Sequence, residues 1–245
     1  MNMLIPLRAI LAKDMKAYYL KPPNISWGII FPLAWTGMFF IRSVGSFGDI
    51  PSLLPGVTAI SILFGTTSML AVTVTFEKKN RSFERLLMSP MPLELLMVAK
   101  TLGAILFGVA NSLVPLLLAM SFTGYSLIHW ELFLPTVILI STVSAFLGFF
   151  VAVAVSEVFE AQTFSNFIRF PMIFLCGLFF PISALPSFLR PVSYALPLTY
   201  GVDLLRRVFT GASSMGTGMN LAVLAGYSTV LFALTLVNVK RKWIR

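Results

Sequence analysis

The chain has 245 residues, of which 58% are hydrophobic and only 11% are charged. This composition leaves too little polar surface to cover a water-soluble globule, so a soluble enzyme is excluded. The net charge of +9 would suit a nucleic-acid-binding protein only if the basic residues lined one face of a folded domain. They lie instead in the short gaps between apolar runs, so no nucleic-acid partner is expected.

Six charge-free runs divide the chain, and each is as long as the ~20 residues that a helix needs to cross a bilayer core. They cover 22–41, 50–76, 101–128, 132–156, 170–189 and 208–239. The sequence therefore predicts an all-α, polytopic membrane protein in which residues 1–245 form one domain with six transmembrane helices. The expected helices are 25–41, 53–76, 99–120, 132–156, about 161–180 and 219–239.

The distribution of basic residues predicts the topology. Fourteen of the 18 Lys and Arg residues lie in segments 1–21, 77–100, 157–169 and 240–245, and the other four lie in the alternate loops. Because positive charge in short loops favours the cytoplasmic side, the first set is expected in the cytoplasm. The prediction is a multi-pass protein of the cell inner (plasma) membrane with both termini cytoplasmic.

The first 21 residues have the pattern of an interfacial helix rather than of a cleaved secretory signal. Apolar side chains recur at spacings of three and four, at Leu4, Leu7, Leu11, Met15 and Tyr18. Pro22 and Pro23 would end this helix and turn the chain into the first transmembrane helix. A solvated tail is the alternative interpretation.

The segment 77–98, after the second expected span, predicts a short cytoplasmic helix and a turn. Phe83, Leu86 and Leu87 fall on one helical face, charged residues occupy the others, and Pro90 and Pro92 force the turn. A charged segment of this kind is usually a solvated flank. Because this one is long and also carries an apolar face, docking of a partner is an equally good interpretation.

Two features inside the expected spans are candidates for a translocation path. The second span is rich in hydroxyl side chains, including Thr66 and Thr73, which could line a path or pack within the bundle. The fifth span would place Arg169 inside the membrane, where an ionisable residue is a functional candidate by default. Extension of the Arg169 side chain toward the cytoplasmic surface is the alternative.

The segment 181–207, between the fifth and sixth spans, does not fit a continuous helix. Pro181, Pro186, Pro191 and Pro197 interrupt it every five or six residues, although it is too apolar to stand in water. It predicts a re-entrant segment of short, broken helices that dips into the membrane from the outer side.

A ladder of small residues marks one face of the fourth span. Ser144, Gly148, Ala152 and Ser156 lie four residues apart, which lets another helix approach closely. We therefore expect this face to pack against protein and not against lipid.

The sequence lacks the common catalytic motifs. It has no phosphate-binding loop of the form GxxxxGK[ST], no GxSxG nucleophile motif, one histidine, His129, and one cysteine, Cys176. We expect no enzyme activity, no catalytic residues, no metal site and no cofactor in this polypeptide.

Three motifs resemble those of the ABC type-2 export permeases, the membrane subunits that include the daunorubicin-resistance and polysaccharide-export permeases. The segment 81–90 is similar to the family's Gly-Thr-Leu-Glu-Arg-Leu-Leu followed by Thr-Pro, with departures at Arg81, Ser82 and Phe83 and matches at Glu84, Arg85, Leu86, Leu87 and Pro90. Residues 177–186 are similar to the exit of the family's fifth span, and residues 196–206 resemble its Pro-x-Thr before an outer Arg.

The resemblance implies the membrane subunit of an ATP-driven exporter. Such a subunit pairs with a second permease copy in the lipid membrane, and two separate ABC ATPase subunits supply hydrolysis. The ATPase-coupling residues would be Phe83, Glu84, Arg85, Leu86, Leu87 and Pro90. The outer gate would comprise Phe180, Pro181, Pro186, Leu189 and Pro197. The transported substrate would be a hydrophobic or amphipathic compound: a drug, a lipid or a glycan.

Two other classes of function are alternatives. A secondary transporter would couple ions through carboxylates inside the membrane, whereas all nine acidic residues fall in expected loops or at span ends. A passive membrane scaffold or sensor would need no ATPase partner.

Overall fold

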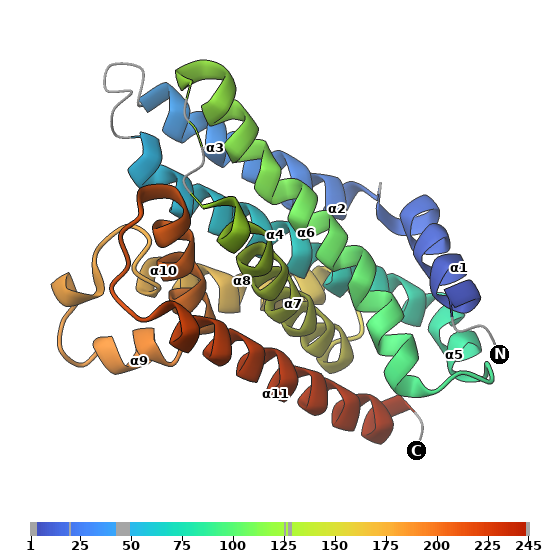
Figure 1. The fold of residues 1–245 in the computed structure, drawn as a ribbon. Helices are drawn as coiled ribbons and strands as arrows, with labels where there is room; N and C mark the ends of the chain where they lie inside the picture. The colour runs from blue at the N-terminus through green and yellow to red at the C-terminus, as the bar shows by residue number, and fades with distance from the viewer. Residues whose placement is uncertain (1–3, 20, 43–49, 125, 127–128, 244–245) are drawn as a thin grey trace.

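The computed structural model describes residues 4–19, 21–42, 50–124, 126 and 129–243, and within these ranges it contains helices and no strand. Figure 1 shows a bundle of long helices with shorter ones at both ends. The elements are α1 (Leu4–Asp14), π-helical η1 (Met15–Tyr19), α2 (Pro22–Ile25), π-helical η2 (Ser26–Ile30), α3 (Phe31–Arg42), α4 (Ile50–Lys79), α5 (Ser82–Leu87), α6 (Leu93–Thr123), α7 (Trp130–Ala154), α8 (Val158–Leu175), 3₁₀-helical η4 (Ile182–Ala184), α9 (Arg190–Tyr194), α10 (Pro197–Thr210) and α11 (Thr217–Trp243).

Among the described residues, four helices are long and apolar enough to cross a membrane: Pro51–Lys79, Leu93–Ser121, Trp130–Ala154 and Thr217–Trp243. They correspond to the second, third, fourth and sixth expected spans. The first expected span is divided among α2, η2 and α3, and the fifth is α8, an 18-residue helix that includes Glu160 and Arg169. The all-helical fold is confirmed, and the count of six crossings stays a prediction.

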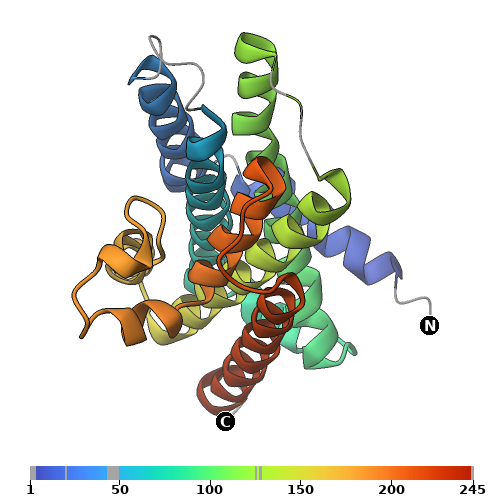
Figure 2. The same ribbon diagram turned by 60° about the vertical axis from the view of Figure 1, so that its left-hand side comes forward.

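Helix α4 is the centre of the bundle. Its most apolar stretch is entirely buried, whereas only 17% of the corresponding stretch of α11 is buried. It contacts α3, α6, α7, α8 and α10, and Figure 2 shows it between α3, α6 and α10. The hydroxyl-rich sequence of α4 therefore lies inside the protein, where side-chain hydroxyls can bond to the backbone or to neighbouring helices.

The small-residue face of α7 packs against α4, as expected. A Cβ atom on Gly148 would lie 2.5 Å from the Thr67 carbonyl oxygen, so the two backbones approach too closely for any side chain at this position. Ser144 and Ala152 on the same face are also buried. Ser156 is exposed because α7 ends at Ala154.

The N-terminal segment is helical, but the face that it turns toward the bundle differs from the apolar stripe. The buried side chains are Ile10, Asp14 and Tyr18, spaced four residues apart, whereas Met15 is 53% exposed. The buried Asp14 pairs with a lysine on α6, so an ionic contact helps to set the rotation of this segment. Its position along a membrane surface stays a prediction.

The proline-rich segment forms η4, α9 and α10. Pro191 lies in the first turn of α9 and Pro197 begins α10. A backbone N–H at these positions would have no hydrogen-bond partner within the helix, so proline removes no bond there. Helix α10 continues to Thr210 and buries most of its length against α4, α7 and α11. The insertion of this segment into the membrane stays a prediction.

Candidate functional site

Helix α5 is the expected coupling helix, and it lies in the connection between α4 and α6 at the end of the bundle that also holds α1 (Figure 1). Arg81 precedes it with a φ of 54°, a left-handed conformation that reverses the chain after α4. At its other end the Ser89 hydroxyl donates a hydrogen bond to the Leu86 carbonyl oxygen at 2.6 Å. Pro90 and Pro92 follow, and α6 begins at Leu93.

The side chains of α5 divide into an anchored face and an exposed face. Phe83 is buried, and its ring packs edge-on against Trp243 at 4.6 Å and Phe149 at 6.3 Å between centroids. Leu86 and Leu87 are half-buried beside it, whereas Glu84 and Arg85 are exposed, as is Pro90. The structure therefore brings the expected coupling residues together, with Phe83 as the anchor and the two charged residues available to a partner.

A buried cluster of charged residues lies next to α5. The Lys100 ammonium donates hydrogen bonds to both Asp14 carboxylate oxygens, at 2.8 and 2.9 Å, and to Glu77 Oε1 at 2.6 Å. Lys13 also donates to Glu77 Oε1. Asp14, Glu77 and Lys100 are each no more than 2% exposed, although they come from α1, α4 and α6.

This cluster joins the N-terminal segment to both helices that flank α5. Glu77 is in the last turn of α4, Lys100 is in α6, and the Tyr18 hydroxyl lies 3.3 Å from the hydroxyl of Ser82, the first residue of α5. Burial raises the pKa of Asp14 to about 6, and the Lys100 charge opposes that rise. The cluster therefore includes a carboxyl group that holds its proton more tightly than an exposed aspartate does.

Sequence analysis missed the cluster because it placed Glu77 in the cytoplasmic segment 77–98 and counted Lys100, at the start of the third expected span, with the cytoplasmic charges. Two signals could have pointed to it. Asp14 is the only acidic residue among the first 21, and Lys100 stands within the apolar helical stretch 95–107. A lysine in such a stretch needs a carboxylate partner if the helix is buried.

Arg169 lies at a second buried polar site, between α8 and α4. Its guanidinium donates to the Ser68 hydroxyl at 2.6 Å, the Phe64 carbonyl oxygen at 3.3 Å, the Asn166 side-chain oxygen at 2.7 Å and the Ser165 carbonyl oxygen at 3.2 Å. It also lies 4.4 Å from the centre of the Phe64 ring. The side chain is fully buried and does not extend to the surface of the chain.

The three expected path residues do not form one site. Phe64 and Ser68, which contact Arg169, lie on one face of α4, and Thr66 faces the opposite way, toward α6 and α7. A Cβ on Gly108 would lie 2.2 Å from the Thr66 hydroxyl, so these helices are in close contact there. Thr73 is buried, and its hydroxyl has no hydrogen-bond partner in the described part of the chain.

The expected outer-gate residues lie at the α9 end of the bundle. Phe180, Pro181 and Pro186 are exposed, and Leu189 and Pro197 are half-buried. Arg190 donates hydrogen bonds to the carbonyl oxygens of Ser183 and Leu185, at 2.7 and 3.0 Å, and so closes the turn between η4 and α9.

Within the described ranges, no group of three or more His, Cys, Asp or Glu side chains could hold a metal ion.

The sequence matches a known family over most of its length. Residues 6–210 match the model of the ABC-2 type transporter family. The inner membrane transport permease YadH of Escherichia coli K12 is 20% identical over 241 residues, which cover 93% of this chain and 92% of that protein. Nodulation protein J of Rhizobium meliloti is 32% identical over 72 residues, covering 29% of this chain and 28% of the relative. Because the family model covers well over half of the chain, this protein belongs to the ABC-2 type transporter family.

Proposed function

We propose that this chain is the membrane subunit of an ATP-driven exporter and forms the path for a hydrophobic or amphipathic compound, such as a drug, a lipid or a glycan. The observation that carries the proposal is α5, a short helix anchored by Phe83 that presents Glu84 and Arg85 to a partner. Members of this family are membrane subunits that work with ATPase subunits and usually dimerise. The chain itself has no phosphate-binding loop, so hydrolysis is assigned to a separate subunit.

The proposed complex contains two ATPase subunits and two copies of this chain in the plasma membrane, with α5 and both termini in the cytoplasm. YadH, a relative along nearly the whole chain, is described as an inner membrane permease. The clustering of basic residues near α1, α5 and the end of α11 supports this orientation, since positive charge favours the cytoplasmic side.

The packing of α5 provides a route for mechanical coupling. Phe83 contacts Phe149 of α7 and Trp243 of α11, so a push on α5 by the closing ATPases would reach these two helices directly. The ion cluster would carry the same displacement to α1 and α6, because Lys100 bonds to Asp14 and Glu77. The segment containing Phe180, Pro181, Pro186, Leu189 and Pro197 would open at the far end, which is alternating access.

Charge reversal on the exposed face of α5 tests the proposal. Glu84→Lys is expected to weaken co-purification with the ATPase and to reduce its stimulation, while membrane insertion and melting temperature stay unchanged because Glu84 is exposed and forms no ion pair in the described structure. Glu131→Lys is the matched control, an exposed charge reversal at the start of α7, at the opposite end of the bundle. Full ATPase stimulation by the Glu84→Lys permease would refute the assignment of α5 as the coupling helix.

A further inference from the structure

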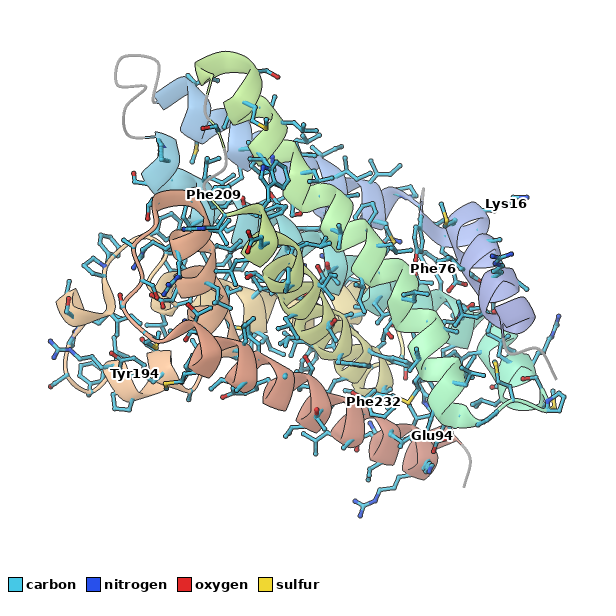
Figure 3. The ribbon with its side chains drawn as sticks, in the orientation of Figure 1. Lys16, Phe76, Glu94, Tyr194, Phe209 and Phe232 are labelled. Carbon is cyan, nitrogen blue, oxygen red and sulfur yellow. The ribbon has the colours of Figure 1, made fainter. Side chains whose placement is uncertain are left out.

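A small polar cavity lies at the α9 end of the bundle, away from α5 and the ion cluster. Its volume is about 160 Å³, and its walls include Gly177, Ser183, Tyr194, Asp203, Arg206 and Ser214. These residues come from the turn after α8, from η4, α9 and α10, and from the loop after α10; Figure 3 labels Tyr194 at this end. A cavity of this volume holds a benzene-sized molecule.

The carboxylate in the cavity wall, Asp203, already has its hydrogen bonds supplied by the protein. The two Asp203 oxygens accept hydrogen bonds from the Ser213 hydroxyl at 2.8 Å, the Asn220 amide at 2.8 Å, and the Ser214 and Met215 backbone N–H groups at 2.8 and 3.1 Å. Burial by itself would raise the pKa of Asp203, but these hydrogen bonds lower it overall. Asp203 therefore stays ionised, and its acceptor sites are occupied by the loop after α10.

The guanidinium in the same wall, that of Arg206, keeps unused hydrogen-bond donors. Arg206 Nη2 donates to the Gly177 carbonyl oxygen at 2.9 Å, and this is the only hydrogen bond of the guanidinium within the described structure. Gly177 has a φ of +80°, a backbone conformation that glycine adopts without strain. Arg206 forms no ion pair with the described residues, so Nε and Nη1 keep donors for a ligand.

The surroundings of the cavity match an amphipathic ligand. Within the described structure, the hydroxyl groups of Ser183 and Tyr194 form no hydrogen bond to the protein. Phe180, which is 58% exposed, directly precedes the wall residue Pro181 and provides apolar surface for a hydrocarbon chain. A guanidinium with free donors, beside two hydroxyl groups, is a typical arrangement for binding a phosphate or sulfate group.

We propose that this cavity binds the oxyanion of an amphipathic molecule, a phosphate or sulfate ester, with Arg206 as the main ligand. The Ser183 and Tyr194 hydroxyls donate additional hydrogen bonds, and the apolar part of the molecule lies along Phe180. This binding site needs no ATPase subunit, so its test is independent of the exporter function proposed above.

The test measures ligand-induced stabilisation of the purified permease, since a ligand that binds only the folded state raises the melting temperature. The permease is reconstituted in phosphatidylcholine nanodiscs, and two probes are added separately: phosphatidylglycerol in the bilayer and inorganic phosphate in the buffer. Native mass spectrometry counts retained phosphatidylglycerol. Arg206→Gln is expected to weaken binding about ten- to a hundredfold, because it removes charge-assisted hydrogen bonds. Arg207→Gln, the adjacent exposed arginine, is expected to bind like the parent.

The two probes distinguish the source of the oxyanion. Stabilisation by phosphatidylglycerol alone supports a lipid headgroup as the ligand. Stabilisation by inorganic phosphate supports a site for free oxyanions. In either case the stabilisation must be lost in the Arg206→Gln variant. Ser183→Leu provides a second variant that fills the cavity and leaves the Arg206–Gly177 contact in place, and it is expected to lose binding as well. Equal stabilisation of the parent and both variants, or stabilisation by neither probe, would overturn the proposal.

Discussion

Lys100 and Arg169 are both buried cations, but the protein compensates their charges in different ways. Lys100 bonds to two carboxylates, those of Asp14 and Glu77. Among the described residues, Arg169 bonds only to neutral groups, a hydroxyl, an amide and two carbonyl oxygens, and it lies against the Phe64 ring. An ammonium is a compact charge, whereas the guanidinium charge is delocalised over a plane with five donors. In this protein, neutral dipoles and an aromatic ring therefore stabilise the charge of the buried Arg, whereas carboxylates stabilise the charge of the buried Lys.

The two cations also differ in the helices that they connect. Lys100 connects α1, α4 and α6, three elements that meet near α5. Arg169 connects α8 to α4. Figure 3 shows Glu94 near the same end as α5, where its carboxylate accepts a hydrogen bond from Lys240 at 3.2 Å. That pair is exposed and is worth less than the buried cluster, because water screens it.

The largest effect is expected from Lys100→Met. This change leaves the Asp14 carboxylate buried without its cation and Glu77 with Lys13 alone, which should cost about 3–5 kcal/mol of stability. The measurement is the melting temperature of the detergent-purified permease. Lys16→Met is the matched control, because Lys16 is exposed on the N-terminal segment (Figure 3), and its effect should stay within about 0.5 kcal/mol. Equal melting temperatures for the two variants would show that the cluster does not stabilise the fold.

A smaller loss is expected from Arg169→Met. Here only neutral acceptors lose a partner, and two of them are carbonyl oxygens of helices, so the cost should be about 1–3 kcal/mol. The measurement is the melting temperature of this variant compared with that of Lys100→Met, which shows how much each way of stabilising a buried cation contributes. If Arg169→Met is the less stable of the two, the proposed difference between carboxylate and dipole compensation is wrong.

A helix contact without charged groups gives a reference for these two losses of stability. Gly148→Leu should cost about 1–3 kcal/mol through overpacking, because even a Cβ would meet the Thr67 backbone at 2.5 Å. Gly226→Ala on α11 is the control, since nothing lies within 4 Å of a Cβ there. A melting temperature of Gly148→Leu equal to that of the parent would place this face of α7 away from α4.

The smallest effect is a pH dependence that Asp14 contributes. Its pKa is about 6 in the folded protein against an ordinary value of 3.8, so the folded state binds the proton more tightly than the unfolded state. This contribution to stability is complete below about pH 4 and is lost as the pH rises through about 6. The parent should therefore lose stability relative to Asp14→Asn between pH 4 and pH 7. A melting-temperature difference that is constant over this range would exclude the titration of Asp14.

The sequence by itself determined the helical class, the four described helices that are long and apolar enough to cross a membrane, and the position of α5. These features depend on local properties: the length of an apolar run, the spacing of Phe83, Leu86 and Leu87, and the prolines that end or begin a helix. The small-residue face of α7 was also predictable, because Ser144, Gly148 and Ala152 share a helical face whatever they pack against.

Only the tertiary structure decided which polar groups meet. Asp14 and Lys100 are 86 positions apart, and Arg169 and Ser68 are 101 apart. Their contacts depend on how each helix is rotated and how far it slides along its neighbour, and these are collective results of packing. Sequence analysis placed Glu77 in a cytoplasmic segment and counted Lys100 with the cytoplasmic charges, because hydropathy scores each residue by type and does not show which partners would stabilise a buried charge.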